Sequence, residues 1–500
     1  MIFDQTSTIG SADMIRKGFD NKKYLSLQSE KIEERISAFG DKLYLEFGGK
    51  LFDDFHASRV LPGFEPDSKI KMLLKLKEIA EILIVISAND IEKNKYRSDL
   101  GITYDADVIR LIEVFKNQGL YVGSVVMTMY QPLPRVDAFI KRLENLGVKV
   151  YKHYSIEGYP SDVQKIVSDE GYGKNEFVPT SRRLVVVTAP GPGSGKMATC
   201  LSQLYHENKR GVKAGYAKFE TFPIWNLPLS HPVNVAYEAA TADLNDVNMI
   251  DPYHLEAYGS LAVNYNRDVE IFPVVNAMLQ KILGQSPYNS PTDMGVNMAG
   301  FCIVDDEICK EASCAEIVRR YYDAQCDARK ARVSKEVVGK IELLMSKMGL
   351  SVDDRKPVAV ALQKAELTGA PAVAIGLTDG NIVAGKTSAL LGSSAAALLN
   401  ALKILGGIDD SVELISPTVI EPIQRLKVNY MGACNPRLHT DEVLMALAIC
   451  AVDSETPKLA LDQLDKLKGC EVHSTVILSD VDLKTFKSLG MRVTCEPIKH

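Results

Sequence analysis

Short continuous apolar runs alternate with segments of helical periodicity over the first 220 residues. The apolar runs predict strands at residues 42–47, 81–88, 120–129, 148–153, 185–188 and 213–221. The periodic segments predict helices at residues 68–80, 107–117 and 136–146. Parallel strands that are buried on both faces have such continuous apolar runs. Repeated units of this kind predict an α/β fold whose sheet is mainly parallel and carries helices on both faces.

The pattern becomes irregular from residue 222 to about 290, where Pro, Asn, Asp and Tyr are frequent. A connection of this length in a compact domain is usually functional or holds small helices. Residues 314–348 then predict two helices. We therefore assign residues 1–330 to an α/β domain and residues 331–350 to a connecting helix.

A second region begins after the polar stretch S-V-D-D-R-K-P at Ser351. An apolar strand (371–377), the turn T-D-G-N and a second strand lead into A-G-K-T-S, and an alanine-rich helix follows at 395–405. A helix at 442–452 and strands at 472–478 and 492–495 complete the pattern. Residues 351–500 are therefore predicted to form a smaller C-terminal α/β domain.

The sequence V-V-V-T-A-P-G-P-G-S-G-K-M-A-T-C-L leads from a predicted strand through a glycine-rich turn into a helix. Glycines allow several backbone N–H groups to converge on a phosphate, and the helix N-terminus adds partial positive charge. Gly191, Gly193 and Gly195 would supply these donors. Ser194 would add a hydroxyl contact, and Lys196 would neutralise the phosphate charge and act in catalysis.

The match to the phosphate-loop pattern G-x-x-x-x-G-K-[ST] is incomplete. Pro190 occupies the first glycine position, and Met197 occupies the hydroxyl position that would ligate Mg²⁺. A thioether is a poor ligand for this hard cation. The anion-binding half of the motif is therefore present and a role for Mg²⁺ is in doubt. A turn that serves only close helix–sheet packing would have a similar sequence.

The first strand ends in F-G-G-K-L-F-D-D-F-H-A-S-R. Ligands of open α/β sheets bind at the carboxyl ends of the strands, so this segment is a candidate substrate site. Its predicted contact residues are Gly48, Gly49, Lys50, His56 and Arg59. A turn followed by a solvated helix face would equally account for the sequence.

Three aspartates, Asp243, Asp246 and Asp251, lie in the segment A-T-A-D-L-N-D-V-N-M-I-D-P-Y-H. They could hold a divalent ion, or one could act as a general base, and Asp243 and Asp246 would share a face if the segment were helical. Helix caps and turns are the simpler interpretation of each aspartate taken singly.

Three weaker motifs have simpler structural interpretations. F-C-I-V-D-D-E at residues 301–307 is similar to the strand that carries a Mg²⁺-orienting aspartate, but a buried helix end has the same composition. The G-K-T at residues 385–387 lacks the upstream glycines of a phosphate loop. Cys434 and His439 could be paired as nucleophile and base, although a lone Cys and His are more often structural.

Composition narrows the classes of partner. A formal net charge of −6 argues against nucleic acid, and no apolar run is long enough to suggest a membrane span. No secretory signal is recognised, and nine scattered cysteines without C-x-x-C favour reduced thiols in the cytoplasm. A small-molecule phosphate ligand is the expected partner, and the possibility of a homo-oligomer stays open.

The stretches E-F-G-G-K-L-F-D-D-F-H-A-S-R-V-L-P-G-F, T-A-P-G-P-G-S-G-K-M-A-T-C-L-S-Q-L-Y-H-E and K-F-E-T-F-P-I-W-N-L-P-L resemble a bacterial family of conserved proteins with a domain of unknown function. Some of its members are labelled ATP-dependent peptidases. The resemblance covers nearly the whole chain. It implies a nucleotide-kinase-like α/β domain and a smaller C-terminal domain of deaminase-like topology. This chain lacks the H-x-E and P-C-x-x-C zinc ligands of deaminases and any protease motif.

The sequence as a whole favours an enzyme that binds ATP or another nucleotide and performs phosphoryl transfer or ATP-driven ligation on a small molecule. Two alternatives belong to other classes. One is a non-catalytic protein that senses a nucleotide or anion, and the other is an ATP-independent hydrolase or peptidase.

Overall fold

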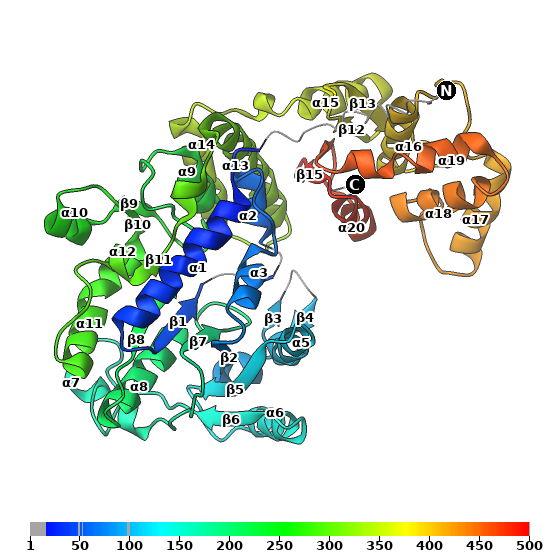
Figure 1. Cartoon of the computed structure of the whole chain (residues 1–500). Helices are drawn as coiled ribbons and strands as arrows, with labels where there is room; N and C mark the ends of the chain where they lie inside the picture. Colours follow the sequence, from blue (N-terminus) through cyan, green and yellow to red (C-terminus); the bar gives the residue numbers. More distant parts are fainter. Residues whose placement is uncertain (1–16, 49–50, 53, 98–100, 500) are drawn as a thin grey trace, which may run out of the picture. The chain divides into compact units, whose positions relative to one another are not determined.

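The computed structural model describes residues 17–48, 51–52, 54–97 and 101–499, and its elements are labelled in Figure 1. The chain divides into two compact units. The first comprises Met1–Glu238 and Asn245–Ser313, and the second comprises Ala239–Leu244 and Cys314–His500. Among the described residues, no helix has the length and apolar character needed to cross a membrane.

The first unit is built on a seven-stranded sheet whose strands are all parallel, as the continuous apolar runs predict. In spatial order these strands are β11 (Gly295–Val296), β8 (Gly215–Phe219), β1 (Leu43–Phe47), β7 (Leu184–Thr188), β2 (Ala80–Ser87), β5 (Tyr121–Thr128) and β6 (Lys149–Lys152). β7 is therefore the central strand. Two small two-stranded sheets pair β3 (Tyr96–Arg97) with β4 (Ile102–Thr103), and β9 (Asn248–Ile250) with β10 (Val263–Tyr265).

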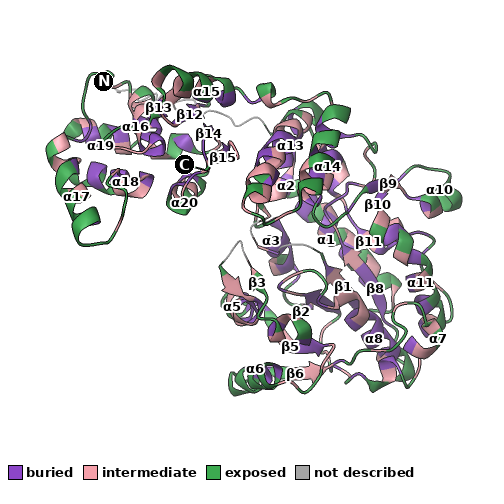
Figure 2. Ribbon diagram, turned by 180° about the vertical axis from the view of Figure 1, so that it is seen from behind, coloured by how far each residue is buried: buried purple, intermediate pink, exposed green. Residues whose placement is uncertain are grey.

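Helices cover both faces of the seven-stranded sheet. The helices of this unit are α1 (Asn21–Ala38), α2 (Phe55–Val60), α3 (Ser68–Lys75), α4 (Ala88–Glu92), α5 (Tyr104–Asn117), α6 (Pro134–Asn145), α7 (Val163–Ile166), α8 (Lys196–Lys209), α9 (Pro232–Ala240), α10 (Pro252–Tyr258), α11 (Asn266–Leu283) and α12 (Pro291–Met294), with short 3₁₀ turns η1 (Tyr172–Lys174) and η2 (Ala299–Cys302). α1 and α3 lie on one face, as Figure 1 shows. α8 and α11 pack on the other, against alternate strand residues such as Tyr44, Val185, Val187 and Tyr216. β2 and β7 are buried along their whole length, and the buried colour predominates in the middle of the sheet in Figure 2.

The segment after residue 222 holds more regular structure than its composition predicts. The prediction of irregular structure was wrong for residues 266–283, which form the long helix α11 despite Pro273 in its interior. Val269, Phe272, Val275, Leu279 and Ile282 of this helix are buried at helical spacing. Their burial against α8 outweighs the missing backbone hydrogen bond at the proline. The other pieces of the segment are short, as expected.

The Phe301–Glu307 stretch does not form a strand. Residues up to Cys302 belong to η2, and α13 (Asp306–Arg329) begins within the acidic cluster. The structure thus contradicts the strand interpretation and favours a helical one, although the stretch lies at a helix start with exposed acids rather than at a buried helix end. The two acids at positions 306 and 307 lie in the first turn, where negative charge is favoured by the helix dipole.

The second unit has a mixed four-stranded sheet. Its strand order is β13 (Ile382–Lys386), β12 (Ala372–Gly376), β14 (Glu471–Ser474) and β15 (Arg492–Cys495). β12 runs antiparallel to both neighbours, and β14 and β15 are parallel. The helices from α14 on are α14 (Lys335–Lys347), α15 (Pro357–Thr368), α16 (Ser393–Gly406), α17 (Pro417–Asn429), α18 (Thr440–Cys450), α19 (Glu455–Leu461) and α20 (Asp480–Ser488), with η3 (Val352–Asp354) and η4 (Leu464–Leu467).

His439 takes part in a capping cluster of the second unit. The Asp482 carboxylate accepts from His439 Nδ1 at 2.9 Å and from the backbone N–H of Thr440 at 3.0 Å. The Ser479 hydroxyl also donates to Asp482, at 2.8 Å. The cluster ties the start of α18 to the start of α20. Cys434 is exposed. The contacts of His439 therefore favour a structural role over a catalytic pairing.

Replacing Asp482 with asparagine is expected to destabilise the second unit by about 1–2 kcal/mol at pH 5.5 and by less at pH 9. Burial alone would raise the pKa of Asp482, but His439, the Thr440 amide and Ser479 lower it overall. The hydrogen bond to Asp482 raises the pKa of His439. The carboxylate contributes above its unfolded pKa of about 3.9, and the contribution is lost as pH falls through the lowered folded value. The imidazolium contributes below its unfolded pKa of about 6.5, and the contribution is lost as pH rises through the raised folded value.

Urea denaturation of both proteins at the two pH values measures this difference. Asp480→Asn is the matched control, because Asp480 lies on the same helix turn and is exposed. An equal loss at pH 5.5 and pH 9 would contradict the role assigned to the ion pair.

Candidate functional site

The glycine-rich loop connects the central strand β7 to α8, as the sequence predicts. It leaves the sheet at the carboxyl edge, where open α/β sheets bind ligands. Gly193 and Gly195 have φ values of 72° and 88°, a region that residues with side chains rarely adopt. Gly195 is the N-cap of α8, and no side chain caps this helix. The backbone conformation of the turn that leads into α8 therefore requires glycine at positions 193 and 195.

The loop is held in shape by side chains that bond to its carbonyl groups. Ser194 Oγ donates to the Gly191 carbonyl at 2.6 Å, and Thr128 Oγ1 donates to the Ser194 carbonyl at 2.6 Å. In the part of the chain that the structure describes, the backbone N–H groups of residues 193–198 donate to no protein acceptor. A run of six such donors at a helix start is the arrangement that binds phosphate. The Ser194 hydroxyl already donates its hydrogen bond to a carbonyl of the loop, so the predicted contact between Ser194 and a phosphate stays a prediction.

Close packing accounts for two of the glycines. A Cβ atom at Gly191 would lie 2.3 Å from the Tyr104 hydroxyl, and one at Gly195 would lie 3.1 Å from Thr128. At Gly193, by contrast, a Cβ would meet no atom within 4 Å. Packing therefore explains Gly191 and Gly195 in part, whereas the exposed Gly193 is required only by the backbone conformation.

Lys196 is the first residue of α8 and is half-buried. Among the described residues it has no hydrogen-bond or ion-pair partner, and the first turn of α8 contains no acidic residue. Met197 packs against the apolar core, and Thr199 is fully buried with an Oγ1 atom that has no hydrogen-bond partner. Position 197 therefore offers no oxygen to a metal ion, whereas the positive charge at position 196 is not neutralised by a carboxylate.

Charged residues from two neighbouring strands lie on the same face as α8. Glu46 of β1 accepts from the Tyr216 hydroxyl at 2.8 Å. Burial raises the pKa of the Cys200 thiol, Glu46 raises it further and Lys196 opposes this, so both charges lie within electrostatic reach of that thiol. Lys218 of β8 forms ion pairs with Asp268 and Glu220. Sequence reasoning missed these residues, although one charge near the carboxyl end of an apolar strand was a usable signal.

The segment after β1 is described only in part. Gly48 lies against the Phe219 carbonyl, and Gly49 and Lys50 lie outside the described residues. His56 and Arg59 lie on α2, one turn apart. The His56 ring is 5.3 Å from that of Phe222. Their predicted contact with a substrate stays a prediction.

The three aspartates after residue 240 do not come together. The segment forms turns rather than a helix, so Asp243 and Asp246 do not share a helical face. Asp243 is exposed, Asp246 is buried and pairs with Arg267 at 2.9 Å, and Asp251 caps α10. The described residues contain no group of three or more His, Cys, Asp or Glu side chains that could hold a metal ion. The predicted catalytic roles of Asp243 and Asp246 gain no support from this arrangement.

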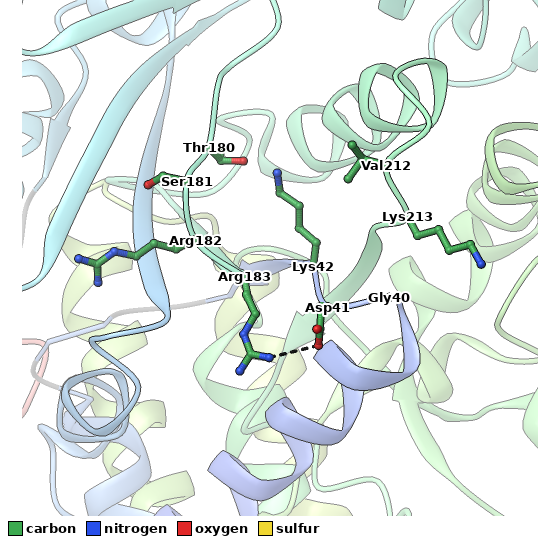
Figure 3. Close-up of a pocket in the computed structure, with 9 residues that line it drawn as sticks. All are labelled: Gly40, Asp41, Lys42, Thr180, Ser181, Arg182, Arg183, Val212 and Lys213. Carbon is green, nitrogen blue, oxygen red and sulfur yellow. Dashed lines mark hydrogen bonds and ion pairs between the residues drawn. The ribbon is translucent and has the colours of Figure 1, made fainter.

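A cavity of about 260 Å³ lies at the opposite, amino edge of the sheet, where β1, β7 and β8 begin. Its lining is shown in Figure 3. Lys42 is paired with Glu207, and Arg183 is paired with Asp41 at 3.2 Å, while Arg182 and Lys213 point outwards. Because the inward-facing cations are already neutralised, this cavity is a weaker anion site than the glycine-rich loop.

Comparisons with known proteins indicate one family over nearly the whole chain. The family model described as "Domain of unknown function DUF1846, N-terminal" matches residues 17–349, and "Domain of unknown function DUF1846, C-terminal" matches residues 353–499. A UPF0371 protein of Streptococcus pyogenes serotype M3 is 58% identical over 480 residues, which cover 96% of this chain and 97% of the relative. A UPF0371 protein of Streptococcus thermophilus is 57% identical over 484 residues, with 97% and 98% covered. Neither name mentions a peptidase. The chain belongs to the DUF1846 family, whose N-terminal and C-terminal domain models match it one after the other.

Proposed function

We propose that the loop at residues 189–196 binds the phosphate groups of a nucleotide, with ATP as the first candidate. The observation that supports this most directly is the run of backbone N–H groups at residues 193–198 without protein acceptors. Lys196, which has no carboxylate partner among the described residues, adds a positive charge at the same place. In this respect the first unit resembles nucleotide kinases, whose phosphate loop also joins a central strand to a helix.

The proposed reaction class is phosphoryl transfer to a small molecule, or ATP-driven ligation, in the cytoplasm. Phosphoryl transfer depends on positioning and on neutralising charge, which the loop and Lys196 can supply. The nine cysteines are all free thiols, as expected in a reducing compartment. Saturable nucleotide binding without turnover of any acceptor would instead favour the sensing protein.

Calorimetric titration with ATP, GTP, ADP, NAD and inorganic phosphate tests the proposal. We expect saturable ATP binding whose Kd changes by less than about threefold when Mg²⁺ is replaced by EDTA, because Met197 provides no metal ligand. GTP at the same concentrations tests the base preference, and inorganic phosphate tests the loop alone. No heat of binding with any of the five ligands, in protein shown to be folded by circular dichroism, would refute the proposal.

A further inference from the structure

A lysine and two carboxylates form a nearly buried cluster at the carboxyl edge of β8. Lys218 contacts Asp268 of α11, and its Nζ lies 3.2 Å from Glu220 Oε1. The side chains of Lys218, Glu220 and Asp268 are 16%, 10% and 11% exposed. Glu220 thus retains a small accessible surface at the edge of the sheet where the glycine-rich loop lies.

The surroundings of Glu220 favour a carboxyl group that exchanges a proton near neutral pH. One lysine cannot neutralise two carboxylates, and water is largely excluded. Burial raises the pKa of Glu220 to about 7, with Lys218 lowering it and Asp268 raising it. Two buried tyrosines, Tyr237 and Tyr265, also lie within electrostatic reach of Glu220, and Glu46 acts on Lys218.

The distance from the loop suits a substrate that spans the two sites. β8 and β7 are separated only by β1, so their carboxyl ends lie about 10 Å apart. An N–H group that binds a phosphate oxygen, a nucleophile about 3 Å from the phosphorus and a base about 3 Å from the nucleophile together span a similar distance.

We propose that Glu220 is the general base for a small molecule with a hydroxyl group, which accepts the γ-phosphoryl group of ATP held at the loop. This rests on the function proposed above. The hydroxyl proton passes to the Glu220 carboxylate, and the oxygen lone pair forms the new bond to phosphorus. The bond from phosphorus to the bridging oxygen breaks with its electron pair, which leaves with ADP. Glu220 then returns the proton to solvent.

Two neighbours act as positioning residues. Lys218 holds the Glu220 carboxylate through the ion pair, and Asp268 holds Lys218 from the first turn of α11. Gly295 leaves room for the carboxylate, because a Cβ at this position would lie 2.7 Å from Glu220 Oε2. These contacts fix the base relative to the carboxyl edge, which a general base requires.

The test is the proton uptake that accompanies ATP binding at pH 7, obtained from calorimetry in buffers of different ionisation enthalpy. Phosphate charge about 10 Å away is expected to raise the pKa of Glu220 further, so its protonated fraction at pH 7 rises when ATP binds. Wild type should therefore take up a fraction of a proton more than Glu220→Gln, whose Kd for ATP should change little. Glu81→Gln is the matched control, since Glu81 is a buried carboxylate at the amino edge of the same sheet.

Equal proton uptake by wild type and Glu220→Gln, with ATP binding intact, would overturn the role of Glu220 alone. Absence of ATP binding to folded wild type would overturn both this role and the proposed function. If Glu220→Gln does not fold, infrared spectra of wild type between pH 6 and 8 decide the question. One carboxyl band must titrate near pH 7 and shift to higher pH with ATP, and its absence would overturn the assignment.

Discussion

Replacing Lys196 with alanine is expected to weaken ATP binding by about 10- to 150-fold while leaving the fold unchanged. A charge-assisted contact to a phosphate contributes about 1.5–3 kcal/mol, and loss of the positive charge also removes its longer-range attraction. Lys196 has no hydrogen-bond or ion-pair partner among the described residues, so its removal breaks no such interaction. The free energy of unfolding should change by less than about 0.5 kcal/mol. Calorimetry gives the Kd, and urea denaturation gives the stability.

Lys209→Ala is the matched control for this experiment. Lys209 lies at the other end of the same helix, and its half-exposed ammonium pairs with the exposed Asp169. Because exposed ion pairs contribute little, this variant should keep the wild-type Kd within about twofold. Equal ATP affinity in wild type and Lys196→Ala would show that ATP does not bind at the loop.

The strands were predictable because the sheet is buried on both faces. A continuous run such as E-I-L-I-V-I-S-A has no alternative of comparable burial, and the observed β2 begins one residue earlier than predicted. α11 was missed because Pro273 and the polar flanks hide its helical periodicity. The helix is stabilised by the burial of its apolar residues against α8, which the local sequence does not show. Propensity is a weak guide where tertiary burial is large.

The candidate site was predictable only at the loop. Glycine and lysine spacing encodes the local turn, so Gly193, Gly195 and Lys196 could be identified from sequence. Glu220 and Asp268 are 48 residues apart and meet only because β8 and the start of α11 share a face of the sheet. No local sequence pattern indicates a contact between residues so far apart in the chain. Asp251, in contrast, could be understood locally, since an aspartate before Pro and Tyr is a common helix cap.

The second G-K-T motif contains a glycine whose replacement is expected to have a large effect on stability. Gly385 lies in β13, and a Cβ at this position would be 2.1 Å from the backbone nitrogen of Ala397 in α16. The small residues at the start of α16 allow this close approach, as the sequence suggests. We expect Gly385→Ala to destabilise the second unit by more than about 3 kcal/mol. The new Cβ would clash with backbone atoms, and a change of side-chain rotamer cannot relieve such a clash.

Gly339→Ala provides the matched control for Gly385→Ala. Gly339 lies inside α14, and a Cβ there would meet no atom within 4 Å. The same chemical change should stabilise the protein at this position by about 0.5–1 kcal/mol, because alanine has the higher helix propensity. Urea denaturation followed by circular dichroism measures both variants. A Gly385→Ala protein as stable as wild type would mean that β13 and α16 can separate without cost, which would remove the packing reason for this glycine and restore the anion-site interpretation of the motif.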